Sequence, residues 1–166
     1  MKTKVLSIFA IATIALISCK KTEPAVPAGP GEATIEGVLY APLNLGNDTA
    51  TTGGYELHNE FAPNGTKVTA VIDTEDLQKD PQNGYNYEKL QFTTTVSNDG
   101  VFTFSNLPAI SQSAGVKLKF GDFKADQAQV DPSNNPAENK IYTLNDKTAF
   151  VYAGAKVIKE YTYIAN

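Results

Sequence analysis

Few side chains in this sequence could act as nucleophiles, proton carriers or soft metal ligands. The 166 residues include a single cysteine, Cys19, and a single histidine, His58. A serine triad needs a histidine aligned between its partners, and a zinc site needs several His or Cys ligands. Nor can one cysteine form an internal disulfide. We therefore expect no cofactor, no metal-dependent or triad catalysis, and a protein that is not an enzyme.

Carboxylates are the remaining candidates for acid–base or metal chemistry. Glu56 and Glu60 flank His58, and a pair of carboxylates can supply acid and base in glycoside hydrolysis. We favour a solvated loop here, because nothing in the sequence places the pair across a cleft. Residues 73–80 hold the densest group of acids, but Gln78 stands where a calcium loop of the EF-hand type requires glycine. We expect a solvated acidic loop there, with an irregular calcium site as the alternative.

The N-terminus has the layout of a secretory signal peptide. Lys2 and Lys4 precede an uncharged, mostly apolar run over residues 5–17, and Lys20 and Lys21 follow it closely. A membrane-spanning helix needs about 20 apolar residues, so this run is too short to span comfortably. The pattern predicts export of the chain.

The end of this segment, Leu16-Ile17-Ser18-Cys19, resembles the lipobox of bacterial lipoproteins. The resemblance implies removal of residues 1–18 and attachment of diacylglycerol to the sulfur of Cys19. The chain would then be held on a membrane through its lipids, since each buried CH₂ contributes about 0.8 kcal/mol. The Lys-led signal and the Ser-Cys-Lys-Lys junction resemble lipoproteins of the Bacteroidetes, which implies the outer membrane, on its periplasmic face or at the cell surface.

The mature chain divides into a tether and one domain. Residues 19–32 contain three prolines and no apolar periodicity, which favours an extended, flexible tether. Residues 33–166 have the length and apolar content of a single domain. Loss of residues 1–18 moves the formal charge from −4 to −6, because two lysines and no acid are removed. Every basic residue is lysine, so the bidentate guanidinium favoured for nucleic acid is missing and we expect no nucleic-acid partner.

Short segments with alternating apolar and polar residues predict strands. Residues 116–120 place Val, Leu and Phe on one face and two lysines on the other, and the apolar positions of residues 66–73 should also point inward. No stretch of the mature chain has sustained helical spacing. The predicted strands are 33–41, 66–73, 87–96, 101–105, 116–120, 140–144, 148–153 and 156–164, so we expect an all-β domain of about seven or eight strands.

One turn gives the sharpest local prediction. Asn98-Asp99-Gly100 has the composition of a tight turn, because glycine readily adopts the positive φ that such turns require. It separates residues 87–96 from residues 101–105. We predict that these two segments pair as a β-hairpin.

Three segments together resemble the carboxypeptidase regulatory-like and transthyretin-like family. They are Gly37-Val38, residues 65–70 (Gly-Thr-Lys-Val-Thr-Ala) and residues 99–109 (Asp-Gly-Val-Phe-Thr-Phe-Ser-Asn-Leu-Pro-Ala). The resemblance covers roughly residues 33–124 and implies a single antiparallel β-sandwich, transthyretin-like (prealbumin-like) with an Ig-like Greek key. It does not imply a substrate, because one fold hosts many functions.

Two long connections, residues 42–64 and 74–86, are where contacts with partners are expected. The first contains Asp48-Thr49-Ala50, which resembles an O-glycosylation site of the Bacteroidetes and would place a glycan on Thr49. The second ends near Tyr85 and Tyr87, whose rings could form a platform for sugars or could simply pack beside a strand.

We thus expect an envelope lipoprotein that acts as a noncatalytic structural or accessory module. The alternative is a carbohydrate- or peptide-binding lipoprotein of a nutrient-uptake or adhesive assembly. Its partners would be the membrane, through the lipid on Cys19, and an envelope protein or glycan.

Overall fold

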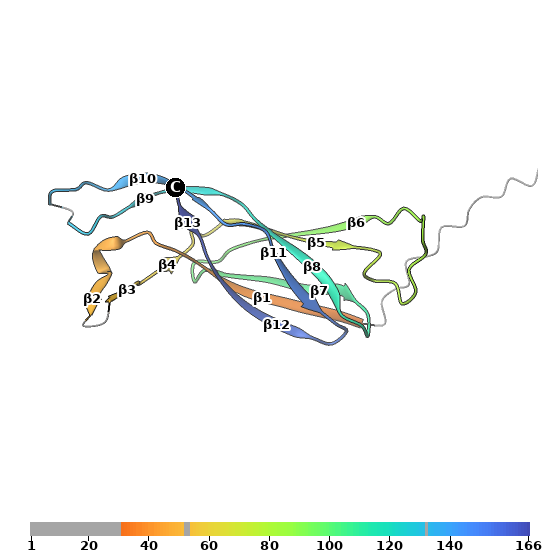
Figure 1. Cartoon of the computed structure of the whole chain (residues 1–166). Coiled ribbons are helices and arrows are strands. Elements are labelled where there is room, and N and C mark those ends of the chain that lie inside the picture. Colours follow the sequence, from red (N-terminus) through yellow and green to blue (C-terminus); the bar gives the residue numbers. More distant parts are fainter. Residues whose placement is uncertain (1–30, 52–53, 132) are drawn as a thin grey trace, which may run out of the picture.

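The computed structural model describes residues 31–51, 54–131 and 133–166 (Figure 1). The regular elements in these ranges are strands, apart from one 3-10 turn, so the predicted all-β class is confirmed. Residues 1–18 and Cys19 lie outside the described residues. The elements are β1 (Gly31–Ala41), η1 (Leu45–Asn47), β2 (Thr49–Thr51), β3 (Gly54–Glu56), β4 (Glu60–Phe61), β5 (Lys67–Asp73), β6 (Lys89–Thr95), β7 (Val101–Ala109), β8 (Ala114–Phe120), β9 (Phe123–Gln127), β10 (Glu138–Thr143), β11 (Lys147–Val151), β12 (Lys156–Thr162) and β13 (Ile164–Ala165).

The strands form several sheets. In the first sheet β1 pairs in parallel with β12 on one side, and antiparallel with β7 and β4 on the other. The second sheet is antiparallel throughout and has the order β11-β8-β5-β6. A smaller sheet has the order β13-β10-β9, and β2 pairs with β3 alone. Figure 1 shows an elongated molecule, with the smaller sheet and the β2–β3 ribbon at one end and the start of β1 at the other.

The two larger sheets share one hydrophobic core. The positions predicted to point inward on β5 are fully buried, and the alternating positions of β8 are buried as well. Side chains of β1 and β7 in the first sheet belong to the same core cluster. Full burial of a Val, Leu or Phe side chain contributes roughly 1.5–3 kcal/mol, so this shared core holds the two sheets together. Its members include Val68, Ala70, Ile72, Val116, Leu118, Phe120, Ile35, Leu39, Phe102 and Phe104.

The predicted hairpin of residues 87–96 with 101–105 is wrong, although its turn is present. Gly100 has a φ of 70° and donates its N–H to the carbonyl of Ser97 at 3.1 Å. However, β6 pairs with β5 and β7 pairs with β1, so this turn carries the chain from one sheet to the other. The physical reason is a long-range contact: the N–H of Leu39 in β1 donates to the carbonyl of Gly100 at 2.9 Å, which fixes the turn beside β1.

Short or polar strands account for most of what the sequence patterns missed. The prediction did not include β2, β3, β4 or β9, which have between two and five residues. The predicted last strand, 156–164, is divided at Tyr163 into β12 and β13. These missed strands belong mainly to the end of the molecule that lies away from the start of β1 (Figure 1).

Two tyrosines join the smaller sheet to the rest of the fold. Tyr142 of β10 stacks on Phe123 with ring centroids 4.9 Å apart, and Tyr163 meets the same ring edge to face. The hydroxyl of Tyr163 donates to the carbonyl of Gly121 at 2.9 Å, and that of Tyr142 donates to the carbonyl of Pro42 at 3.2 Å. Both side chains are buried, and their hydroxyls therefore have partners as buried polar groups require.

We predict that Gly37→Ala destabilises the protein. A Cβ on Gly37 would lie 2.3 Å from two atoms of the buried Phe102 ring, so the core must shift, at a cost of about 1–3 kcal/mol. Chemical denaturation measures this loss, and Gly37→Ala with Phe102→Leu should recover part of it. The matched control is Gly115→Ala in β8, where the nearest atom to a new Cβ is 3.5 Å away. Equal effects of the two glycine substitutions would contradict this account of β1.

We also predict an alkaline loss of stability that depends on Tyr163. Burial, with a smaller effect of the Asp122 carboxylate, raises the pKa of Tyr163 well above its ordinary value of 10.0. The unfolded chain therefore releases this proton at lower pH than the folded protein does, and stability falls as the pH rises above about 10. Tyr163→Phe should be less stable than wild type near neutral pH, because the bond to Gly121 is lost, yet should show a shallower alkaline decline.

The measurement is urea unfolding of both proteins between about pH 8 and pH 11. The control is Tyr152→Phe, because Tyr152 is exposed and its replacement should leave the alkaline decline unchanged. A Tyr163→Phe protein with the wild-type alkaline slope would show that this phenol does not govern the transition.

Candidate functional site

The carboxylates around His58 organise a loop. The N–H groups of Leu43 and Asn44 both donate to Oε2 of Glu60 at 2.9 Å, and Nδ2 of Asn47 donates to its Oε1 at 2.7 Å. The backbone N–H of His58 donates to the Asp48 carboxylate at 2.8 Å, while its own side chain is exposed. Both oxygens of Glu60 are thus engaged in holding the segment between β1 and β2.

The predicted modification site and the acidic loop lie on different parts of the fold. Thr49 begins β2, where its backbone is paired with that of Glu56 in β3. Asp73 ends β5, and its carboxylate accepts the N–H of Glu75 at 3.1 Å. No group of three or more His, Cys, Asp or Glu side chains within the described residues is arranged to hold a metal ion. Glycosylation of Thr49 and calcium binding by residues 73–80 stay predictions.

The two tyrosines predicted as a ligand surface contact each other. The rings of Tyr85 and Tyr87 meet edge to face, with centroids 4.8 Å apart and planes at 66°. The Tyr87 hydroxyl accepts the N–H of Gln82 at 2.6 Å, and both side chains are half-buried. The pair therefore helps to shape the connection between β5 and β6, and its role as a platform stays a prediction.

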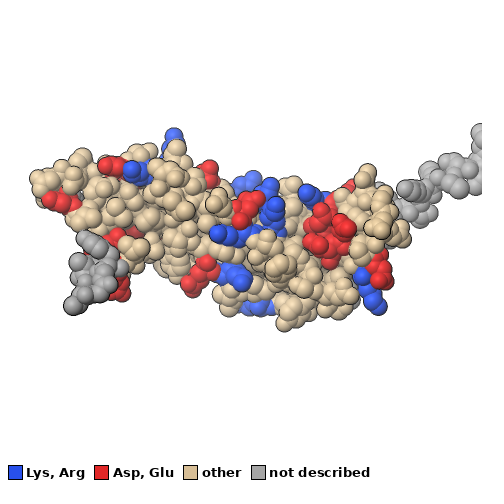
Figure 2. Space-filling model, in the orientation of Figure 1, with Lys and Arg blue, Asp and Glu red and all other residues tan. Residues whose placement is uncertain are grey.

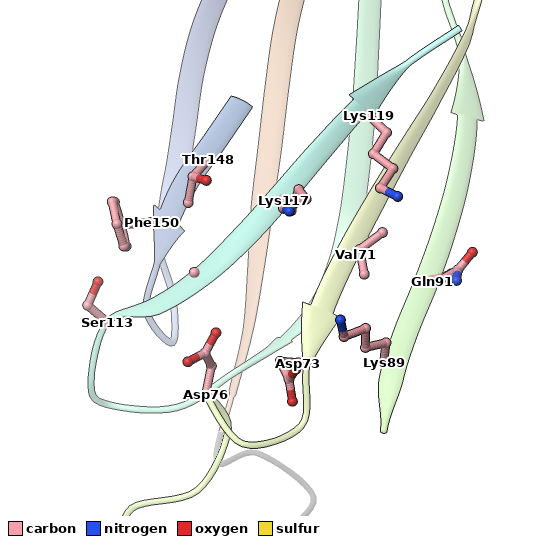
Figure 3. Close-up of a pocket in the computed structure, with 11 residues that line it drawn as sticks. Val71, Asp73, Asp76, Lys89, Gln91, Ser113, Lys117, Lys119, Thr148 and Phe150 are labelled. Carbon is pink, nitrogen blue, oxygen red and sulfur yellow. The ribbon is translucent and has the colours of Figure 1, made fainter. Parts of the chain in front are cut away.

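The structure shows a groove that the sequence patterns did not indicate. It has a volume of about 480 Å³ and lies on the outer face of the β11-β8-β5-β6 sheet, opposite the core (Figure 3). Cross-strand register explains its lining, since residues opposite one another share a face. One row across β11, β8, β5 and β6 consists of Thr148, Lys117, Val71 and Gln91.

A glycine deepens one end of this groove. Gly115 of β8 lies opposite Phe150 of β11, and Asp73 of β5 lies opposite Lys89 of β6 in the neighbouring pair. Because Gly115 has no side chain, the surface is hollow between the Phe150 ring and the Asp76 carboxylate, both of which line the groove (Figure 3). Phe150 is 66% exposed, so most of its ring is available for contact.

The groove has charged groups of both signs, and only Lys117 and Lys119 lie away from its acidic end, since Lys89 is across the sheet from Asp73. Lys117 and Lys119 project from β8, Lys89 projects from β6, and the two aspartates lie together at one end (Figure 3). The ion pairs within the described ranges are Lys140 with Glu138 and Lys156 with Glu36, and neither pair includes a lysine of the groove. Figure 2 shows basic groups gathered over the middle of this face, with a dense acidic group beside them toward the end where β1 starts.

The sequence patterns predicted the direction of some side chains that line this groove, but they did not predict the groove. The alternation in residues 116–120 correctly predicted that both lysines of β8 lie on the solvent face. Their neighbours come from β5, β6 and β11, and only the pairing register places these strands side by side. Gly115, at an outward position beside two lysines, is the one local signal that could have indicated a hollow.

Comparison with known proteins does not assign this chain to a family. No family model matches it, and no curated protein matches it. Over the described ranges, none of the elements is a helix with the length and apolar character needed to cross a membrane.

We predict that Glu60→Ala loosens the segment between β1 and β2. The substitution removes three hydrogen bonds to a carboxylate, two of them from backbone N–H groups, and should cost about 2–3 kcal/mol. Glu60→Gln should lose less, because its amide oxygen still accepts the backbone pair. Chemical denaturation and limited proteolysis measure the effect, with Glu56→Ala as an exposed control in β3. Equal stability of the Glu60 and Glu56 variants would refute the structural role of Glu60.

Proposed function

We propose that this chain is a lipid-anchored, noncatalytic module of the bacterial cell envelope. The observation that carries the proposal is Leu16-Ile17-Ser18-Cys19, which follows a basic start and an apolar run as in exported lipoproteins. Two or three acyl chains at Cys19 would hold the protein firmly on its membrane. The outer membrane is the proposed location, with the domain on its periplasmic face or at the cell surface.

The arrangement of strands supports a module that is anchored at one end. The chain enters the described fold at Gly31, the start of β1, so the last two residues of the predicted tether belong to this strand. The β2–β3 ribbon and the smaller sheet lie at the opposite end (Figure 1). Lipids at Cys19 would therefore attach the molecule by the end that carries the start of β1 and leave the other end for partners in the envelope.

We further propose that the fold is a β-sandwich of the transthyretin-like type. In support, two four-stranded sheets share one core, and the chain passes from β6 in one sheet to β7 in the other and back to β8. Such crossing between sheets is typical of Greek-key sandwiches. The residues that resemble the family lie on β1, around β5 and on β7. The segment with β2, β3 and β4, and the smaller sheet, are additions to that pattern.

The noncatalytic role is supported by what the polar side chains do. Glu60 holds a loop, Asp48 accepts a backbone N–H, and His58 is exposed beside them. The carboxylates of Asp73 and Asp76 lie in a groove with three lysines. These side chains fit a scaffold with a binding surface better than an acid–base pair.

A second candidate function is supported by the groove on the β11-β8-β5-β6 face. A carbohydrate- or peptide-binding lipoprotein needs a concave surface with convergent polar groups, and ligand sites commonly have volumes of about 300–1,000 Å³. The groove has a volume of about 480 Å³ and combines charged, neutral polar and apolar side chains. It gives the anchored module a surface on which a partner can bind.

We predict that intact-mass analysis of the full-length protein from its native membrane shows a chain that begins at Cys19 and carries lipid. Cys19→Ala should lack the lipid mass, because no thiol remains to accept diacylglycerol, and should lose membrane retention through lipid. The matched control is Ser18→Ala, which keeps a small residue before the cysteine and should still be lipidated. A wild-type chain without lipid would overturn the anchor and leave only the fold assignment.

A further inference from the structure

We propose that the groove on the outer face of the β11-β8-β5-β6 sheet binds an acidic oligosaccharide, such as a chain of uronic acids. This inference rests on the second candidate function and names its ligand class. The groove is defined by Lys117 and Lys119 of β8, Lys89 of β6, the floor at Gly115, and the ring of Phe150.

The three lysines provide the attraction for an anion. Lys117 and Lys119 are two residues apart on one strand, so their side chains leave the same face about 7 Å apart. Lys89 lies two strands away on β6 and faces the same groove (Figure 3). Asp73 stands directly across from Lys89 in the sheet, yet the ion pairs of the described residues are those of Lys140 and Lys156 and do not include Lys89. The ammonium groups are thus available to carboxylates of a ligand.

The remaining groups of the groove suit the rest of a sugar. Asp73 and Asp76 accept hydrogen bonds, and sugar hydroxyls are good donors to carboxylates. Gln91 can both donate and accept in the middle of the face. The exposed Phe150 ring offers an apolar surface beside the hollow at Gly115, against which the C–H face of a sugar ring can pack. An acidic sugar chain has all of these partners: carboxylates, hydroxyls and C–H faces.

A peptide is a poorer match for this surface. One common way for an extended peptide to bind is to add a strand to a sheet edge, where the N–H and C=O groups of the peptide pair with free backbone groups of the edge strand. The floor of the groove is instead the face of the two central strands, β5 and β8, whose backbones are paired on both sides. A peptide lying across this face would find few partners for its N–H and C=O groups. The hydroxyl groups of a sugar, in contrast, can form all of their hydrogen bonds with the side chains of this face.

The test measures binding of oligogalacturonate to the full-length protein in a non-ionic detergent by isothermal titration. Lys117→Gln and Lys119→Gln should each weaken binding about tenfold, because each removes a charge-assisted bond. Gly115→Val should abolish binding by filling the hollow; its Cβ would meet no atom closer than 3.5 Å, and a β-branched residue suits a strand. Thermal unfolding of each variant confirms that the fold is retained.

The controls separate this inference from the proposed anchor. Lys124→Gln removes the same charge from an exposed strand position outside the groove and should leave binding unchanged. A neutral galacto-oligosaccharide of the same length should bind at least about tenfold more weakly, and so should an aspartate-rich peptide. Equal binding of the neutral sugar, equal or tighter binding of the peptide, or no binding of oligogalacturonate would each overturn the proposal. None of these results bears on lipidation of Cys19, which is read by mass.

Discussion

The central position of β1 is the constraint on which the rest of this structure depends. It pairs with β12 on one side and with β7 and β4 on the other, so it joins the last long strand of the chain to the middle of the sequence. Its inward positions, among them Ile35 and Leu39, are fully buried, and Gly37 leaves the space that the Phe102 ring fills. The close approach of β7 to β1 therefore requires a glycine at this point. Gly31 at the start of this strand is twelve residues after Cys19 in the sequence, so a chain anchored there would enter the core through β1.

Burial of one face of each strand has a direct consequence for the other face. In β5 and β8 the inward positions supply the core, and strict alternation sends every second side chain to the outer surface. Val116, Leu118 and Phe120 are buried in the core, and the alternation of side chains along the strand therefore directs Lys117 and Lys119 to water. A shift of one residue in β8 would exchange the two sets and remove the core and the groove together. The register that stabilises the fold is thus also what assembles the groove from four strands.

The same distinction explains what could be predicted from the sequence. Alternation correctly gave the all-β class, the inward positions of Val68, Ala70 and Ile72, and the outward direction of the β8 lysines, because each depends on burial along one strand. The pairing of β6 with β7 was wrongly predicted, because it depends on how the turn at Gly100 contacts β1, some 60 residues earlier in the chain. Short strands such as β4 and β13 have two residues each and owe their conformation to their neighbours. The groove could not be predicted for the same reason. Its lining residues become neighbours only when β11, β8, β5 and β6 pair in the observed register.

Net charge is a poor guide to what this surface binds. The chain has a formal charge of −4 and an isoelectric point near 5.0, which by itself would disfavour an anionic ligand. At physiological salt, however, exposed charges are largely screened beyond about 8 Å, so a ligand in the groove responds mainly to the side chains that line it. Those side chains include three lysines and two aspartates, with the aspartates gathered at one end. Lys117 and Lys119 instead follow Gly115 on the same face of β8, away from the aspartates, so positive charge adjoins the hollow on one side, which is what an acidic sugar chain requires.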